Sequence, residues 1–198
     1  MPRIITEYKE EVRKKIVDAA YDLFLTKGYH KTTMEEIAAV LGVTKPALYQ
    51  YFPGKEDLYA AVAERGRQEL KGILELSYQN RDIRGGSAAL FDAVSRFAPQ
   101  FQGMYSEMML MAPHNERIRL ILEEDLRGDV LVIERFISLQ QETGFVSSRL
   151  DPHILAVAFH AMVNGLLIDI MAGMDREEAK KIWITTVEAL TGIGHPPS

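Results

Sequence analysis

Residues 33–55 read Thr-Met-Glu-Glu-Ile-Ala-Ala-Val-Leu-Gly-Val-Thr-Lys-Pro-Ala-Leu-Tyr-Gln-Tyr-Phe-Pro-Gly-Lys, and this stretch decides the fold. It predicts two short helices joined by a tight turn. Thr33 and Glu36 have the spacing of a capping box, in which each side chain bonds the free backbone N–H of the other. We therefore expect the first helix to begin at Met34. Gly42 can adopt the positive φ that ends a helix within one residue.

The second helix is expected to begin just after Thr44, whose hydroxyl can cap it. Pro46 is tolerated in the first turn, because the N–H groups there have no partner within the helix. The polar and aromatic residues that this helix is expected to carry are Lys45, Tyr49, Gln50 and Tyr51. Two helices joined this tightly form a helix-turn-helix, whose second helix can enter the major groove of DNA.

The composition is that of a globular intracellular protein. The chain has 198 residues, of which 47% are hydrophobic and 26% charged, so it can bury a sizeable core in one or two domains. It has no cysteine, which excludes disulfides and thiolate metal sites and fits a reducing cytoplasm. The amino terminus lacks the apolar core of a signal peptide. The longest apolar stretch, residues 154–174, contains His160, Asn164 and Asp169 and is a poor membrane span.

The net charge of −5 is unevenly distributed along the chain. Residues 1–55 carry nine Lys or Arg and seven Asp or Glu, whereas residues 56–198 carry fourteen and twenty-one. The first segment is therefore positive by two charges and the second negative by seven. Because attraction to phosphate needs a local basic patch and not a basic protein, this mild asymmetry gives weak support to DNA binding.

The rest of the chain shows helical spacing and turn signals. We find no strand pattern, repeat or low-complexity segment, so the predicted fold is all-α with about nine helices. Residues 80–87, which include Gly85 and Gly86, are predicted to be a loop. The other helices are expected at about residues 7–27, 55–78, 115–143 and 151–171, with further helical spacing over residues 90–108 and a last helix capped by Asp175.

A set of residues with correct spacing extends over about residues 8–60. These are Gly28, Thr32–Thr33, Ile37–Ala38, Gly42–Lys45, Leu48–Tyr49, Tyr51–Phe52, Lys55 and Leu58. In these positions the chain resembles the amino-terminal signature of the TetR (Tet repressor) family of transcriptional regulators. Pro46 stands where the family usually has a small residue, and Tyr51 where it commonly has histidine. Beyond residue 60 the resemblance is one of architecture.

The resemblance implies a helix-turn-helix DNA-binding domain at residues 1–55 and a ligand-binding and dimerisation domain at residues 56–198. Lys45, Tyr49 and Tyr51 would contact phosphates or base edges, Thr33, Thr44 and Lys55 would contact phosphates, and Pro46 belongs to the same surface. Gln50 is the best candidate for reading adenine, and Ala47 for touching a thymine methyl group. The alternatives are that Thr33 and Thr44 are only helix caps and that Tyr49 is a core residue.

Residues 91–111 form the second informative segment. Met104, Met108, Met109 and Met111 lie close together among aromatic residues, and such side chains can rearrange around apolar guests. The alternative is that they are simply core. Because members of the resembled family bind inducers in this part of the fold, we expect a lipophilic ligand here. The predicted pocket residues are Phe97, Phe101, Tyr105, Met108, Met109 and Phe136, with Glu107 or His114 binding a polar group.

The helix expected over residues 151–171 is apolar nearly all round, which predicts a partner on its outer face. We interpret this as a homodimer, in which the last helix completes a four-helix interface. The predicted interface residues are Phe159, Met162, Asn164, Gly165, Leu167, Trp183 and Val187. A two-fold dimer makes the DNA site a palindrome with symmetric half-sites.

These features predict a ligand-responsive regulator, most simply a repressor that a lipophilic molecule releases from double-stranded DNA; an activator of the same fold is the alternative. A helical enzyme acting on an apolar substrate is a rival hypothesis, but the sequence has no metal-binding, phosphate-loop or nucleophile motif. A ligand-blind adaptor is a third. The five histidines are scattered along the chain, and we predict no catalytic residue, metal or cofactor.

Overall fold

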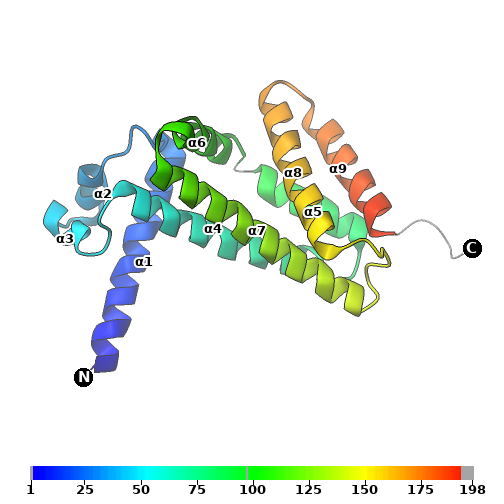
Figure 1. Ribbon diagram of the computed structural model, residues 1–198, viewed down its shortest axis with the longest axis horizontal. Helices are drawn as coiled ribbons and strands as arrows, with labels where there is room; N and C mark the ends of the chain where they lie inside the picture. The colour runs from blue at the N-terminus through cyan, green and yellow to red at the C-terminus, as the bar shows by residue number, and fades with distance from the viewer. Residues whose placement is uncertain (1, 97, 193–198) are drawn as a thin grey trace, which may run out of the picture. The chain divides into compact units, whose positions relative to one another are not determined.

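Helices make up most of the chain, as the computed structural model shows for residues 2–96 and 98–192; the side chains of residues 2–6 and 98–102 are not described. Within these ranges there is no strand, and the predicted all-α fold with nine α-helices is confirmed (Figure 1). The helices are α1 (Pro2–Lys27), α2 (Met34–Leu41), α3 (Lys45–Tyr49), α4 (Lys55–Ser77), α5 (Ile83–Ser95), α6 (Ala98–Met111), α7 (Glu116–Glu142), α8 (Pro152–Met171) and α9 (Arg176–Thr191), with a 3₁₀ turn, η1 (Ala112–His114), before α7.

The loop predicted at residues 80–87 is wrong in its second half, because α5 already begins at Ile83. Its glycines do not break the helix. A Cβ atom on Gly86 would lie 2.3 Å from Cδ1 of Tyr78 and 2.9 Å from the carbonyl oxygen of Ser77. Glycine therefore lets the first turn of α5 approach the end of α4, a packing role that local sequence signals do not reveal.

The chain divides into two compact units, and their boundaries differ from the predicted division after residue 55. One unit comprises Met1–Gly66 and Gly103–Asp125, and the other comprises Arg67–Gln102 and Leu126–Ser198. Parts of α6 and α7 therefore belong to the unit that contains the helix-turn-helix. Asp57 of this unit accepts a 2.5 Å bond from Arg117, a partner sixty residues along the chain.

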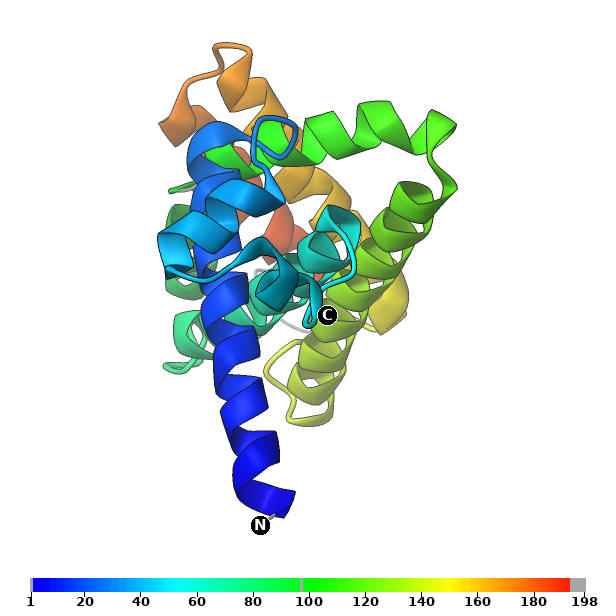
Figure 2. The same ribbon diagram turned by 90° about the vertical axis from the view of Figure 1, so that its left-hand side faces the viewer.

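The first unit has a small aromatic core beneath the helix-turn-helix. The ring of Tyr29 lies 5.4 Å from that of Phe24 and 5.5 Å from that of Tyr59. Ile37 of α2 and Leu48 of α3 are completely buried. Figure 2 shows α2 lying across α1, with α3 following after a short turn. Burial of apolar residues from each short helix holds both helices on the core.

The second unit is organised around α9, which packs against both α5 and α8. Figure 1 shows α8 and α9 side by side. The indole N–H of Trp183 donates to the carbonyl oxygen of Ser87 at 3.0 Å, and its ring meets Phe159 edge-on at 5.9 Å. On the rim, Asp92 accepts bonds of 2.6 Å from both Arg176 and Lys180.

One helix among the described residues, α8, is long and apolar enough to cross a membrane by length and composition. Core helices of soluble proteins meet the same criteria. In this structure α8 packs on α9 and buries Leu155 and Phe159.

Candidate nucleic-acid interface and internal cavity

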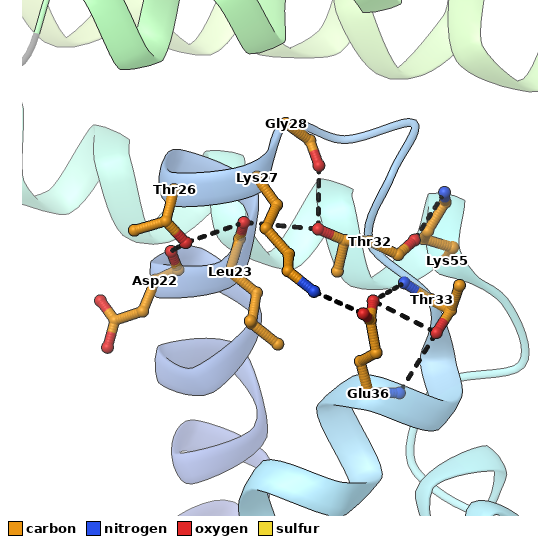
Figure 3. Close-up of polar contacts among 9 residues, drawn as sticks. All are labelled: Asp22, Leu23, Thr26, Lys27, Gly28, Thr32, Thr33, Glu36 and Lys55. Carbon is orange, nitrogen blue, oxygen red and sulfur yellow. Dashed lines mark hydrogen bonds and ion pairs between the residues drawn. The ribbon is translucent and has the colours of Figure 1, made fainter.

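The start of α2 has the predicted capping box. The N–H of Glu36 donates to Oγ1 of Thr33 at 3.2 Å, and the N–H of Thr33 donates to Oε2 of Glu36 at 3.0 Å (Figure 3). The other oxygen of the same carboxylate binds Lys27 at 2.5 Å, which links α2 to the end of α1. At the far end of α2, Gly42 has φ of 65°, the left-handed conformation that was expected.

The second helix, α3, is shorter than predicted. Oγ1 of Thr44 accepts the N–H of Ala47 at 3.4 Å, as expected for a cap. The helix ends at Tyr49, so Gln50 is its C-cap and Tyr51 follows it. The surface of α3 consists of Lys45, Pro46, Tyr49 and Gln50, while Ala47 and Tyr51 are half-buried. The exposed tyrosine and amide can reach base edges or phosphates if α3 enters a major groove.

Lys45 is not a free cation in this structure. Its ammonium group bonds the carboxylate of Glu35 and lies 5.7 Å from the ring centroid of Tyr49. This hydrogen bond lowers the pKa of Glu35 and raises that of Lys45, so both are charged at neutral pH.

Lys55 was predicted to contact phosphate, but its side chain turns inward. Nζ donates to the carbonyl oxygens of Tyr29 and Thr32 at 2.9 Å and of His30 at 3.4 Å. It also lies 4.3 Å from the ring centroid of Tyr29. Burial lowers the pKa of Lys55. The three carbonyls that precede α2 use the three donors of the ammonium, so Lys55 holds this loop against α4.

Arg13 of α1, which the predicted DNA-binding set does not include, supports the end of α3. Its Nη1 donates to the carbonyl oxygen of Tyr51 at 3.3 Å, and its guanidinium lies 4.2 Å from the ring centroid of Phe52. A cation at the carbonyl end of a helix is favourable. The helical spacing of α1 predicts that Arg13 lies on the surface. It does not reveal the contact with Tyr51, which is 38 residues away in the sequence.

The residues predicted to bind ligand on and beside α6 lie in different environments, and the pocket that they were predicted to share stays a prediction. Phe97 lies outside the described residues, and the side chain of Phe101 is also not described. Of the others, Met108 is completely buried in the first unit, Tyr105 is half-buried, and Met109 and His114 are exposed. The carboxylate of Glu107 accepts the backbone N–H of His30 at 2.7 Å. The methionine cluster is thus divided between core and surface.

A cavity of about 70 Å³ lies inside the second unit. Phe136, which was predicted to bind ligand, contributes to its wall. Residues from α4, α5, α7, α8, α9 and the segments that follow α4 and α7 complete the wall: Leu70, Leu74, Tyr78, Ile83, Leu90, Val94, Ile133, Ile137, Gln140, Phe145, Val146, Phe159, Val163, Trp183, Val187 and Thr191. The wall is almost entirely carbon, and among the described residues no charged side chain lines it.

The polar groups on the residues around this cavity mostly have partners elsewhere. The phenol of Tyr78 bonds Oγ of Ser87 at 2.9 Å, and burial raises its pKa to about 12. The indole of Trp183 donates to the carbonyl of Ser87, and Oγ1 of Thr191 donates to that of Val187 at 2.7 Å. The cavity therefore offers van der Waals contact and little hydrogen bonding.

The residues predicted to form a dimer interface lie mostly inside the chain's own core. Phe159, Leu167, Trp183 and Val187 are buried, and Met162, Asn164 and Gly165 are half-buried. Phe159, Trp183 and Val187 belong to the hydrophobic core of the second unit, where α8 packs against α9. The opposite side of α8 exposes Ile154, Val157, Ala158, Ala161 and Ile168 at helical spacing. Assigning the apolar residues of α8 to two faces with the helical period of 3.6 residues would have revealed this second stripe from the sequence.

The arrangement in the first unit is suited to binding a macromolecule. It combines an exposed short helix, two capped helix starts and hydrogen-bonding side chains. Within residues 2–96 and 98–192, no group of three or more His, Cys, Asp or Glu side chains could hold a metal ion.

Comparison with known proteins identifies the same region. Residues 16–62 match the family described as bacterial regulatory proteins, tetR family. The chain is 32% identical over 110 residues to the HTH-type transcriptional activator FasR of Mycolicibacterium smegmatis, which covers 53% of the chain but only half of FasR. It is 24% identical over 182 residues to the HTH-type transcriptional repressor ComR of Escherichia coli, covering 88% of the chain and 87% of ComR.

Solved structures extend the likeness in fold to nearly the whole chain. A protein from Rhodococcus sp. described as a TetR-family transcriptional regulator has a TM-score of 0.74 at 20% identity, with 92% of this chain and 99% of that one covered. SmeT in complex with triclosan has a TM-score of 0.66 at 23% identity, with 94% and 95% covered. At this level of identity, the similarity shows the fold alone.

Proposed function

The chain belongs to the TetR family of bacterial transcriptional regulators, and from this premise we propose that it binds a palindromic operator as a homodimer and that a small apolar ligand changes its affinity for DNA. Of this proposal, membership of the family supports the role of a DNA-binding transcriptional regulator, and regulators of this family are not enzymes. Such a protein acts in the cytoplasm, where the DNA is. The observation that carries the proposal is the capped pair α2–α3, which exposes Tyr49 and Gln50.

We assign sequence reading to Tyr49 and Gln50, the exposed residues at the end of α3. An amide can bond adenine in two places in the major groove. Thr33 and Thr44 are exposed as well as being caps, so helix-start N–H groups and hydroxyls can receive phosphates beside them. Lys55 contributes by holding the loop before α2, and we propose no phosphate contact for it.

The dimer is assigned to the outer face of α8. Ile154, Val157 and Ile168 are 61%, 44% and 52% exposed, and Ala158 and Ala161 between them let another helix approach closely. Ile182 of α9, which is 39% exposed, extends the same kind of surface to the neighbouring helix. An apolar stripe of this length in water is best covered by an identical stripe on a second copy.

We assign the ligand to the cavity of the second unit, to which Phe136 of the predicted pocket residues contributes. Its carbon wall favours an uncharged molecule, since a buried charge without a partner is costly. A volume of about 70 Å³ is smaller than the cavity of about 150 Å³ that accepts benzene. Aromatic side chains in the wall, such as those of Phe136 and Phe145, must therefore rotate to admit a ligand of the size of benzene. The ligand then favours one packing of the helices that surround it, and DNA affinity changes reciprocally.

We propose repression as the outcome. The relatives include both an activator, FasR, and a repressor, ComR. Whether this protein lowers or raises transcription is therefore tested in the cell. Expression of a reporter fused to the DNA upstream of the protein's own gene is expected to rise when that gene is deleted. A fall on deletion would instead establish an activator.

Fluorescence anisotropy tests DNA binding. Saturable binding to the upstream DNA is expected to persist over random competitor DNA at a stated salt concentration. Tyr49→Ala is expected to abolish it, whereas Leu76→Ala, which removes an exposed side chain from α4, is the matched control. If wild-type and Tyr49→Ala proteins bound equally, α3 would not be the reading element.

Thermal shift with toluene, benzoate and benzylamine tests the cavity. Toluene is expected to raise the melting temperature by mass action, and its two charged analogues are not. Val163→Phe, which places a larger side chain at the wall, is expected to remove the toluene effect. Equal shifts with the charged analogues, or with the filled variant, would contradict the assignment without affecting the DNA-binding result.

A further inference from the structure

The reading element is electrically neutral, which is unusual for a surface that meets phosphates. Residues 33–55 contain two lysines and two glutamates. Lys55 is used by the carbonyls before α2, and Lys45 is bound to Glu35. Nearby Lys27 is bound to Glu36, which also forms the capping box. Each of these three lysines thus has a partner within the protein.

The two glutamates differ in what they do for the fold. Glu36 is needed for the start of α2, because its carboxylate closes the capping box. Glu35 instead binds Lys45, the first residue of α3. The side chains of Glu35 and Lys45 are 57% and 47% exposed, so solvent or DNA can reach both. A carboxylate of the scaffold helix therefore holds the only cation that α3 presents.

From this geometry we infer that Glu35 limits the affinity of the protein for DNA phosphates by holding the ammonium group of Lys45 on the protein. Carboxylate and phosphate compete for the same ammonium group. Binding of DNA through Lys45 must break or share the ion pair, so Lys45 displaces less counterion from DNA than a free lysine does. Tyr49 and Gln50, which are neutral, are unaffected by this competition. Glu35 thus shifts the balance from phosphate attraction, common to all sequences, toward contacts with bases.

The test is the salt dependence of binding to a random-sequence duplex, which requires no knowledge of the operator. Glu35→Gln keeps the length of the side chain and removes its charge. Because one phosphate contact changes the logarithmic salt slope by about 0.9, the variant is expected to steepen the slope by about one and to bind about fivefold to tenfold more tightly at 0.1 M salt. Glu188→Gln, which releases Arg84 in the second unit, is the matched control and is expected to change neither quantity.

A double-mutant cycle with Lys45→Met shows whether Glu35 acts through Lys45. In the wild-type background Lys45→Met is expected to weaken random-DNA binding by less than about threefold, and in the Glu35→Gln background by about fivefold to tenfold. An unchanged salt slope in Glu35→Gln would overturn the inference. So would an equal gain from Glu35→Gln in the presence and absence of Lys45, because Glu35 would then act by direct repulsion of phosphate.

A purely structural role for Glu35 gives a different signature. Loss of a negative charge in the first turn of α2 would lower the melting temperature and leave the salt slope unchanged. Lys45→Met keeps the inference testable even if Glu35→Gln folds poorly. A strong loss of random-DNA affinity on Lys45→Met alone, by tenfold or more, would show that Glu35 does not restrain this lysine.

Discussion

The carboxylate of Glu107 and the backbone of His30 are joined by a 2.7 Å hydrogen bond, in which the N–H of His30 donates to Oε2. The two residues are 77 positions apart. Gly28 makes room for the contact, since a Cβ atom there would lie 2.7 Å from Oε1 of Glu107. Gly28 also has φ of 85°, which favours glycine. The loop before α2 is therefore held by α6 on one side and by Lys55 on the other.

Glu107→Ala is expected to lower the free energy of unfolding by about 1 kcal/mol, because the His30 N–H loses a charged acceptor at a partly exposed site. Urea denaturation measures this change. Glu142→Ala, at the exposed end of α7, is the control and should stay within about 0.5 kcal/mol of wild type. Equal stability of the two variants would mean that the bond contributes nothing to folding.

Lys55→Met is expected to destabilise the protein by about 1–3 kcal/mol, since three carbonyl groups lose a charged donor. The salt slope of DNA binding should stay unchanged, because the ammonium group is already engaged. Urea denaturation and anisotropy measure the two quantities. Lys45→Met, whose side chain is exposed, is the comparison and should leave stability within about 0.5 kcal/mol. A shallower salt slope in Lys55→Met would restore Lys55 as a phosphate contact.

Acid is expected to destabilise the protein through His160. Burial lowers its pKa from 6.5, so the unfolded chain binds the proton more readily than the folded chain. Stability should therefore fall as the pH drops below about 6.5, until the folded-state pKa is passed. Asp129 faces the ring, with Oδ2 4.0 Å from Nε2, and Arg67 binds the same carboxylate at 3.4 Å.

Urea midpoints at pH 7.5 and pH 5.0 measure the effect of His160. His160→Gln should reduce the difference between the two midpoints, whereas His153→Gln, which alters an exposed histidine on the same helix, serves as the control. An unchanged pH dependence in His160→Gln would assign the acid sensitivity to other groups.

Val157→Glu is expected to convert a dimer into a monomer. Its side chain is 44% exposed in the single chain, so the substitution is tolerated there but buries an unpaired carboxylate in the proposed interface. Sedimentation equilibrium gives the mass directly. Leu139→Glu, at an exposed leucine of α7, should leave the mass unchanged. Dimers of Val157→Glu with wild-type affinity would place the interface elsewhere.

Much of the DNA-binding unit could be predicted because its signals are local. Thr33 and Glu36 are three residues apart, and Gly42 ends α2 by its own backbone conformation. Such features involve neighbours within one helical turn, so they depend little on the rest of the chain. The same holds for Asp175, which caps α9 as predicted, and for Asp151, which caps α8.

The positions of the individual side chains could not be predicted in this way. Lys55 has the spacing of a phosphate contact, yet it binds carbonyls up to 26 residues back. Glu107 lies among methionines in the sequence but bonds the loop before α2. The apolar character of α8 predicted a partner for this helix, but Phe159, Trp183 and Val187, which were assigned to a dimer interface, lie in the core where α8 packs on α9.

The sequence by itself determined the helices, the caps and the helix-turn-helix, because these follow from the conformational preferences of residues within about four positions of one another. Only the tertiary structure decided which groups Lys45 and Lys55 bind, which face of α8 is exposed and where the cavity lies. Each of these depends on groups that are distant in the sequence and that packing brings within bonding distance, as with Glu107 and His30.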